Sequence, residues 1–400
     1  MSKVIPEASV PATYGGPPAF PAGLPLARPP VGDPGSVASA VRPILSSGML
    51  TNGSYVREFE SRAAEYLGVR HCVAVSSCTS GLMLVIRSLG LSGEIIVPSF
   101  TFAATAHAVA WNGLRPRFAD IDPNTLTLSP DAVSQAIGVR TSAVLATHVF
   151  GTPCDVEGLA EIAKRTGIAL LFDAAHAFGS THNGVHVGGF GDAEVFSLSP
   201  TKVLTAGEGG LITTNNDLLA ERCRIGRDYG NPGDYDCRFV GLNARMSEVH
   251  AAIGLDSFVG LEPRLEARND VADAYHAALS TIPGISFPEV PDSDRSTYKD
   301  FTIMVDAEEY GITALELSEF LADEGIDTRR YYSPPVHTMR AYRYLSGVNG
   351  SLAVTQKISD RVLTLPLWGG MTDEHVLGVA DAMDRIHRYV AGGGMEGRAQ

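Results

Sequence analysis

Apolar residues recur at helical spacing in two segments near the start of the chain. Residues 35–47 carry them at intervals of three and four, which predicts an amphipathic helix that ends before Gly48. A second helix of the same kind is predicted from about Ser54 to Leu67, and Gly68 is suited to cap its C-terminus. The polar loop GMLTNG, residues 48–53, connects the two helices.

From residue 71 the pattern changes to short apolar runs that alternate with helical spacing. The runs predict strands at 71–75, 94–98, 115–118, 142–150, 168–172 and 193–198, and helices near 76–90, 102–111, 130–137, 155–165 and 216–227. Strands that alternate with helices are typical of a mostly parallel, doubly wound sheet. The sequence therefore predicts an α/β fold for this part of the chain.

Beyond residue 227 the pattern predicts a second, smaller unit. Turn formers fill residues 228–243, and a long helix is predicted to begin near Ala244 and to run into the 260s. From about 283, short strands and helices at 313–324 and 373–390 predict an α+β domain. We thus divide the chain into an N-terminal arm (1–34), a large α/β domain (35–243), a linking helix with a small C-terminal α+β domain (244–390), and a flexible tail (391–400). The arm holds nine of the 24 prolines, which predicts a loose, extended conformation.

Composition narrows the possible functions. The formal net charge of −14 disfavours a nucleic-acid or membrane-surface role, and no segment has the apolar length of a membrane span. The five cysteines form no CxxC pair, so neither a disulfide framework nor a metal site is expected, and a reducing cytoplasm fits. The N-terminus shows no signal-peptide pattern.

Two potentially reactive side chains each follow an apolar run that is predicted to be a strand. Asp173 comes directly after the run 168–172, and Lys202 follows the run 193–198. In an open α/β sheet, ligands bind at the carboxyl ends of strands, where both groups are expected to lie. Pyridoxal 5'-phosphate (PLP) needs a lysine for its aldehyde and an acid at its ring nitrogen. The pair therefore favours a PLP site, although a lone lysine in a loop is more often merely solvated.

Other candidates lie at the same expected edge, each with a structural alternative. The run Ser76–Gly81 offers N–H and hydroxyl donors to a phosphate, but it also suits an ordinary helix N-cap. Phe100 and Phe102 follow another predicted strand. One of these aromatic rings is a candidate to stack on a flat ligand, and packing in the core is the alternative role. His176 suits a ligand hydroxyl or a structural hydrogen bond.

Taken together, the motifs resemble the DegT/DnrJ/StrS family of PLP-dependent sugar aminotransferases, which have fold type I. The matching stretches run in the family's order from about residue 35 to 390 and include GMLTNGSYVREFE, HCVAVSSCTSGL, IIVPSFTFAATAHAV, LFDAAHAFGS, GGFGDAEVFSLSPTKVLTAGEGGLITT, GLNARMSEVHAAIGL and YYSPPVH. The resemblance implies a large PLP-binding domain with a mostly parallel sheet and a smaller C-terminal domain.

The resemblance also implies roles for individual residues. Lys202 would bind the cofactor aldehyde as a Schiff base and then move a proton as the catalytic base, and Asp173 would pair with the ring nitrogen. His176 stands where the family usually has Gln, beside the phenolic oxygen. The remaining cofactor contacts implied are ring stacking by Phe102, and phosphate binding by Cys78 (usually Gly in the family), Thr79, Ser197 and a neighbouring subunit's Asn243.

The last of these contacts implies a homodimer with shared active sites. Tyr332 and His337 match positions near the amino donor and the sugar. The basic pair Arg329 and Arg330 is a candidate counter-charge for the nucleotide diphosphate, although an exposed strand edge would explain the pair equally well. The implied reaction moves an amino group from L-glutamate (or glutamine) to a nucleotide-linked keto-6-deoxyhexose, with dTDP-4-keto-6-deoxyglucose favoured. The product would serve a natural product or a polysaccharide.

Several alternatives stay open at this point. A 3-keto sugar nucleotide or a cyclitol (inosose) would use the same cofactor residues, and a non-catalytic PLP-binding regulatory protein would retain the fold. A sugar dehydratase of the family would have His in place of Lys202, so the lysine disfavours it.

Overall fold

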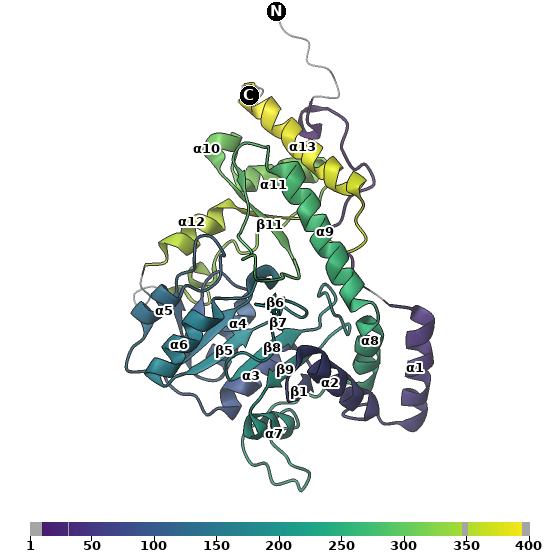
Figure 1. Ribbon diagram of the computed structural model, residues 1–400, viewed down its shortest axis with the longest axis vertical. Coiled ribbons are helices and arrows are strands. Elements are labelled where there is room, and N and C mark those ends of the chain that lie inside the picture. The colour runs from purple at the N-terminus through teal and green to yellow at the C-terminus, as the bar shows by residue number, and fades with distance from the viewer. Residues whose placement is uncertain (1–9, 31, 346–350, 394–400) are drawn as a thin grey trace, which may run out of the picture.

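A seven-stranded sheet forms the centre of the larger part of the molecule (Figure 1). The computed structural model of the chain describes residues 10–30, 32–345 and 351–393. The sheet order is β1-β9-β8-β5-β4-β2-β3, and only β9 runs antiparallel to its neighbours. The strands are β1 (His71–Val75), β2 (Glu94–Pro98), β3 (Arg115–Ala119), β4 (Thr141–Thr147), β5 (Ala169–Asp173), β8 (Ala193–Ser197) and β9 (Gly210–Thr214), with a small hairpin of β6 (Thr181–His182) and β7 (Val185–His186).

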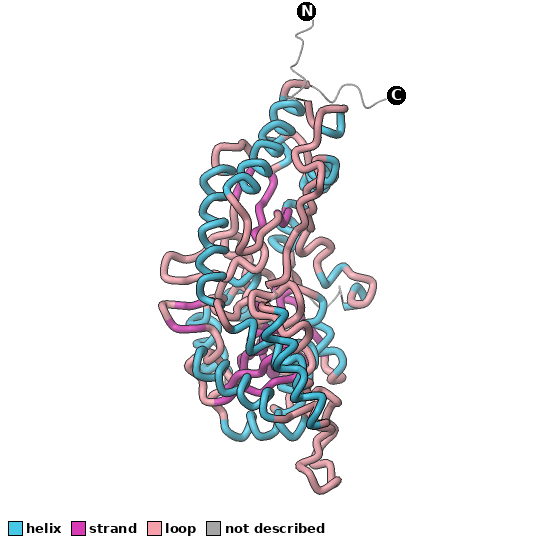
Figure 2. Tube along the Cα trace, turned by 90° about the vertical axis from the view of Figure 1, so that its right-hand side faces the viewer, coloured by secondary structure: helices cyan, strands magenta, loops and turns pink. Residues whose placement is uncertain are grey.

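Helices cover both faces of this sheet, which explains why its strands carry buried apolar residues on both faces. One face is covered by α3 (Cys78–Ser88), α4 (Ala103–Trp111) and α7 (Asp217–Gly226); the other by α2 (Ser54–Leu67), α5 (Pro130–Ala136), α6 (Val156–Thr166) and α8 (Glu248–Phe258). The view turned by 90° shows helices on both sides of the strands (Figure 2). The expected mostly parallel, doubly wound sheet is confirmed.

The expected long helix after residue 244 is in fact two helices. Helix α8 ends at Phe258, and α9 (Leu261–Leu279) begins after a break at Val259 and Gly260. Val259 is extended and Gly260 has a φ of 76°, a left-handed conformation that glycine adopts readily. The break lets α8 pack against α2 while α9 runs toward the second part of the molecule (Figure 1).

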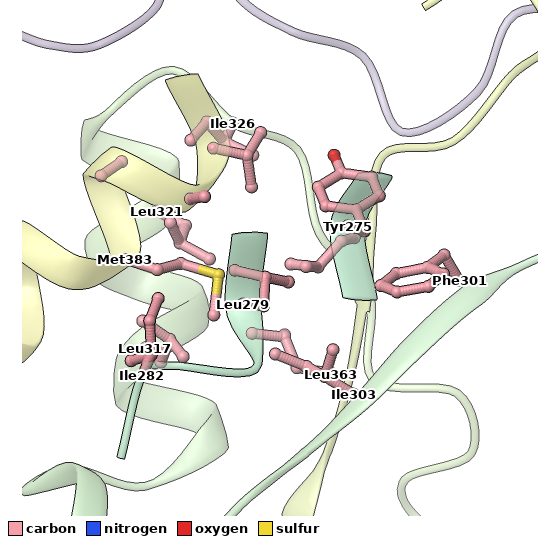
Figure 3. Close-up of a cluster of buried hydrophobic side chains, with 14 of the residues drawn as sticks. Tyr275, Leu279, Ile282, Phe301, Ile303, Leu317, Leu321, Ile326, Leu363 and Met383 are labelled. Carbon is pink, nitrogen blue, oxygen red and sulfur yellow. The ribbon is translucent and has the colours of Figure 1, made fainter. Parts of the chain in front are cut away.

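That second part contains a three-stranded antiparallel sheet of β10 (Ile285–Ser286), β11 (Phe301–Val305) and β12 (Val362–Leu365). Its other helices are α10 (Ala307–Tyr310), α11 (Ala314–Asp323), α12 (Ala353–Arg361) and α13 (Asp373–Ala391). Side chains from α9, α11, α13, β11 and β12 gather in one apolar core, with Leu279 near its centre (Figure 3).

The proline-rich N-terminal segment is not loose where the structure describes it. Residues 10–30 pack against the second part, and the Glu324 carboxylate accepts hydrogen bonds from the N–H groups of Ala12 and Ala19. Leu24 is buried in the core and forms a bridge with Ile326. Proline limits helix here to one short 3-10 turn, Ala12–Tyr14, but leaves apolar side chains free to dock. The rest of the predicted arm, residues 1–9 and 31, and most of the predicted tail (394–400) lie outside the described residues.

Helix α1 (Pro34–Ser47) stands at the edge of the molecule, beside α8 (Figure 1). None of the helices in the described ranges combines the length and the apolar character that crossing a membrane requires.

A buried carboxylate joins α8 to the start of α2. Glu248 accepts hydrogen bonds from the N–H groups of Gly53 (2.8 Å), Tyr55 (2.9 Å) and Val56 (3.0 Å). These groups lie at the N-terminus of α2, where N–H groups lack intrahelical partners and a negative charge is favourable. Glu248 thus supplies the side-chain cap that Gly53 cannot.

Replacement of this carboxylate should destabilise the fold. In Glu248→Gln the side chain loses its charge, and its NH2 group replaces one of the two oxygens that accept hydrogen bonds from the N–H groups. We therefore expect the free energy of unfolding to fall by about 1–3 kcal/mol. Urea unfolding followed by circular dichroism measures the loss. The matched control is Glu161→Gln, whose exposed pairing with Arg165 should contribute no more than about 0.5 kcal/mol. Equal losses in the two variants would contradict the capping role.

Candidate active site

The carboxyl ends of β1, β2, β5 and β8 open into one cavity of about 320 Å³. Asp173 ends β5, Ser197 ends β8, and Lys202 lies in the turn after β8. Eight of the residues expected at the site line this cavity together: Cys78, Thr79, Phe102, Asp173, His176, Ser197, Lys202 and Tyr332. Since the strands are parallel, their ends bring together groups that are far apart in the sequence.

Asp173 lies at the bottom of the site and is almost fully buried. One carboxylate oxygen accepts a hydrogen bond from Thr105 Oγ1 (2.7 Å), and the other accepts one from the N–H of Ala175 (3.1 Å). Burial raises the pKa of Asp173, while these hydrogen bonds and the charge of Lys202 act against that rise. The carboxylate is therefore fixed in orientation and short of solvent, so a cationic or N–H partner would stabilise it.

The N-terminus of α3 forms one wall of the cavity. Ser77 caps the helix in a capping box with Ser80, so the alternative of an ordinary N-cap holds for Ser77. The N–H groups of Cys78 and Thr79 come next, at positions that have no intrahelical acceptor. This wall can bind an anion through backbone donors and the helix dipole, and Ser197 lies on the same cavity.

The close contact between β9 and this helix start depends on a glycine. A Cβ on Gly210 would lie 2.6 Å from the nitrogen of Cys78 and 2.6 Å from the carbonyl carbon of Ser77. Any side chain at this position would push the anion-binding wall away from the strand.

Lys202 lies in the loop of residues 198–209 between β8 and β9. The backbone N–H of Lys202 donates a hydrogen bond to the carbonyl of Ser199 (3.0 Å), and the backbone N–H of Ala206 donates one to the carbonyl of Leu198 (2.9 Å). The pKa of Lys202 is lowered to about 8, first by burial and then by the charge of Lys299, while Asp300 and Asp173 oppose the shift. A larger fraction of this amine is neutral near pH 8 than of an ordinary lysine, so it is suited to act as a nucleophile.

His176 and Phe102 complete the side of the cavity that faces a flat ligand. The Nδ1 atom of His176 is buried, and no described residue forms a hydrogen bond with it. Burial, together with Lys202 and Lys299, lowers the pKa of His176, so the ring is neutral. Phe102 caps α4 at the cavity rim with 63% of its surface exposed, whereas Phe100 is fully buried in the core. Of the two aromatic candidates, Phe102 is the one available for stacking.

Three of the expected residues lie away from this cavity. Asn243 is exposed and accepts a hydrogen bond from Arg245 (3.2 Å). His337 forms a hydrogen bond with Ser99 (2.6 Å), and Arg330 donates to the carbonyls of Ser359 and Asp360. None of the three is among the described residues that line the cavity. The role of Arg330 as a counter-charge stays a prediction, because its guanidinium lies outside this cavity and two of its hydrogen bonds go to backbone carbonyls.

An ion pair in the cavity wall was not expected from the sequence. Lys299 and Asp300 immediately precede β11, and their side chains are 2.6 Å apart and buried. Tyr331 also lines the cavity, beside Tyr332. The sequence signal is weak: two adjacent, opposite charges stand directly before β11, and adjacency alone does not tell whether they face a cavity or solvent.

These groups match what PLP requires. The cavity offers an amine for the aldehyde, a fixed carboxylate for the ring nitrogen, an anion-binding helix start for the phosphate, and an unpartnered buried nitrogen on His176. Together with an α/β sheet that carries them at its strand ends, they define an enzyme of the PLP-dependent transferase class.

Comparisons with known proteins identify the family. Residues 35–384 match the model of the DegT/DnrJ/EryC1/StrS aminotransferase family, so the chain belongs to that family. It is a PLP-dependent sugar aminotransferase of amino-sugar biosynthesis, as the resemblance implied.

Three similar proteins illustrate the range of the family. The chain is 34% identical to the spore coat polysaccharide biosynthesis protein SpsC of Bacillus subtilis, over 86% of this chain and 92% of SpsC. It is 34% identical to a dTDP-3-amino-3,6-dideoxy-alpha-D-galactopyranose transaminase of Aneurinibacillus thermoaerophilus, over 87% of this chain and 94% of that protein. The solved structure of DesI in the presence of its TDP-sugar product superimposes with a TM-score of 0.90 at 38% identity, over 96% of this chain and 97% of DesI.

A small substitution at the phosphate wall tests the geometry of the site. In Gly210→Ala the new methyl group should displace the start of α3, and overpacking of this kind costs about 1–3 kcal/mol. We expect the dissociation constant of PLP to rise by about tenfold or more. Titration of the cofactor-free protein with PLP, followed by absorbance, measures it.

Gly138→Ala is the matched control, since its Cβ would meet only Arg117 Nη1 at 3.5 Å, an ordinary contact. Unchanged PLP affinity in Gly210→Ala would show that the wall does not bind the cofactor.

Proposed function

We propose that this enzyme transfers an amino group from L-glutamate (or glutamine) to a nucleotide-linked keto-6-deoxyhexose. The favoured acceptor is dTDP-4-keto-6-deoxyglucose, which would yield the 4-amino-4,6-dideoxy sugar. The observation that carries the chemistry is the placement of Lys202 and Asp173 in one cavity at the ends of neighbouring strands. The likeness to DesI over nearly the whole of both chains supports a TDP-linked sugar.

Lys202 and Asp173 would divide the chemical work. PLP, when bound, supplies the aldehyde that accepts the amino group and the ring that withdraws electrons. Asp173 would hold a proton at the ring nitrogen, and its two fixed hydrogen bonds orient it for that contact. Lys202 would bind the cofactor and then carry a proton between substrate and cofactor, which a near-neutral pKa favours.

Other residues would hold the cofactor in place. The N–H groups of Cys78 and Thr79, with the hydroxyl of Ser197, would bind the phosphate, and Phe102 would cover the ring. His176 would place its free nitrogen at the phenolic oxygen. The exposed position of Asn243, outside the cavity of its own chain, suits a homodimer with shared active sites in which the partner subunit's Asn243 reaches the phosphate.

Tyr332 is the residue proposed to meet the amino donor or the sugar. It lines the cavity, and it packs against Phe100 and Phe150 with ring centroids 5.5 and 6.0 Å apart, which fixes its position.

We also propose a cytoplasmic location, because the five cysteines are all free thiols.

A 3-keto sugar nucleotide is the second candidate acceptor. The transaminase of Aneurinibacillus thermoaerophilus is named for a 3-amino sugar and is 34% identical to this chain. The two acceptors share every cofactor contact, so the choice depends on the groups that hold the hexose. A non-catalytic PLP-binding role is less suited to the site, since regulation alone does not require both a reactive amine and a fixed acid.

The two half-reactions can be tested separately. The full chain loaded with PLP should lose its yellow colour when L-glutamate is added, because the amino group moves onto the cofactor, and Lys202→Ala should not respond. Visible absorption spectra measure this step. The aminated form should then convert dTDP-4-keto-6-deoxyglucose to an amino sugar, detected by mass spectrometry, at least tenfold faster than it converts the 3-keto isomer.

Each negative result has a distinct meaning. If the colour persists with both glutamate and glutamine, the proposed donor is wrong. If the 3-keto isomer reacts faster, the second candidate replaces the first.

A further inference from the structure

A second lysine lines the cavity that contains Lys202. The chain has only five lysines (Lys3, Lys164, Lys202, Lys299 and Lys357) among 31 basic residues, so arginines number 31 − 5 = 26. Two of those five lysines, Lys202 and Lys299, lie in this one cavity. They are the only Lys or Arg residues among its described lining residues.

Lys299 is held by three sets of contacts. Its side-chain Nζ lies 2.6 Å from Asp300 Oδ1, and its backbone N–H donates a hydrogen bond to the carbonyl of Phe150 (2.8 Å). Buried Arg268 of α9 donates to the carbonyls of Thr297 (3.0 Å) and Lys299 (3.0 Å). Thr297 in turn donates to the carbonyl of His176 (2.6 Å), which joins this segment to the large sheet's side of the cavity. Lys299 is thus a rigid part of the wall.

The charges around Lys202 determine how easily its amine gains a proton. Two amines in one enclosed site disfavour simultaneous protonation, because like charges repel more strongly where water is scarce. Asp300 forms an ion pair with Lys299, with Nζ and Oδ1 2.6 Å apart. The charged or titratable groups that face Lys202 are Asp173, Cys78, His176, Glu208, Lys299, Asp300, Tyr331 and Tyr332 on the cavity side, and Arg28, Arg264 and Arg268 on the opposite side.

We propose that Lys299, paired with Asp300 in the wall of the same cavity, is a positioning residue that favours the neutral, nucleophilic form of the Lys202 amine. The proposal rests on the proposed role of Lys202 as the cofactor-binding amine. Asp300 limits the effect, because its negative charge opposes that of Lys299. Lys299 and Asp300 therefore act on Lys202 in opposite directions, so variants at the two positions should shift its titration with opposite signs.

The opposite signs give a sharp test. In Lys299→Met the positive charge is lost and Asp300 remains, so the apparent pKa of Lys202 should rise by about 1 unit or more. In Asp300→Asn the positive charge remains without its counter-charge, so that pKa should fall by about 1 unit. Lys299→Arg retains the charge and should stay close to the parent, and the double variant Lys299→Met/Asp300→Asn should lie between the two single variants.

The measurement is a competitive labelling of the full chain after removal of PLP. A limiting amount of acetic anhydride acetylates neutral amines, and mass spectrometry quantifies each lysine as the pH varies from 6 to 11. Exposed Lys164 is the internal reference, and Lys357→Met, which removes another exposed lysine, is the matched control. Circular dichroism confirms that each variant is folded.

A second readout uses the full chain loaded with PLP. Its visible absorption titrates with pH, and the midpoint should shift in the same directions as in the labelling experiment. The proposal would be overturned if the titration midpoint shifted in the same direction in Lys299→Met and Asp300→Asn, or if it shifted in neither variant. Unchanged titration with a raised KM for glutamate in Lys299→Met would also overturn it, and would make Lys299 a donor-binding residue.

These outcomes are separate from failure of the proposed function. Labelling reports on Lys202 without any turnover, so an inactive donor or acceptor leaves the titration readable. If Lys202→Ala retains the glutamate response, the proposed function fails whatever the titration shows.

Discussion

The burial of one carboxylate is the constraint on which the site depends. Asp173 ends a central strand with both faces of the sheet covered, so its charge is far from solvent and must be satisfied by neighbours. Thr105 and Ala175 meet part of that need and fix the carboxylate's orientation. The Asp173 carboxylate would be stabilised further by a positively charged group or an N–H donor on its cavity side. The cavity lies where that partner would be, and the parallel strands direct the other groups to the same edge.

The second part of the molecule contributes by way of α9. Arg268 on this helix binds the carbonyls of Thr297 and Lys299, and burial lowers the pKa of Arg268 to about 10. A buried guanidinium is stable only when its donors are satisfied, so the loop before β11 is held where those carbonyls can reach it. The break at Gly260 gives α9 its direction, which places Arg268 over the loop. The backbone conformation at Gly260 thereby contributes to the placement of the loop that carries Lys299 and Asp300.

Elements whose apolar period is strong could be predicted from the sequence. Helices α2 and α11 and strand β5 lie within one or two residues of the predicted bounds, because local spacing and capping residues define them. The break in the α8–α9 segment was missed because the apolar spacing continues through it. Docking of residues 10–30 was missed because proline signals only the absence of helix. For residues 10–30 the deciding contact is distant in sequence, as with Glu324 and Ala12.

The site shows the same division. Asp173 and Lys202 could be placed because strand ends are readable and parallel strands share an edge. Lys299 and Asp300 could not, because no local pattern says which loop of a second domain will face that edge. The same reasoning explains why a net charge of −14 does not prevent binding of an anionic cofactor. At physiological salt, charges more than about 8 Å away are largely screened. The helix start at Cys78 and Thr79 and the hydroxyl of Ser197 can therefore attract a phosphate locally without a basic surface.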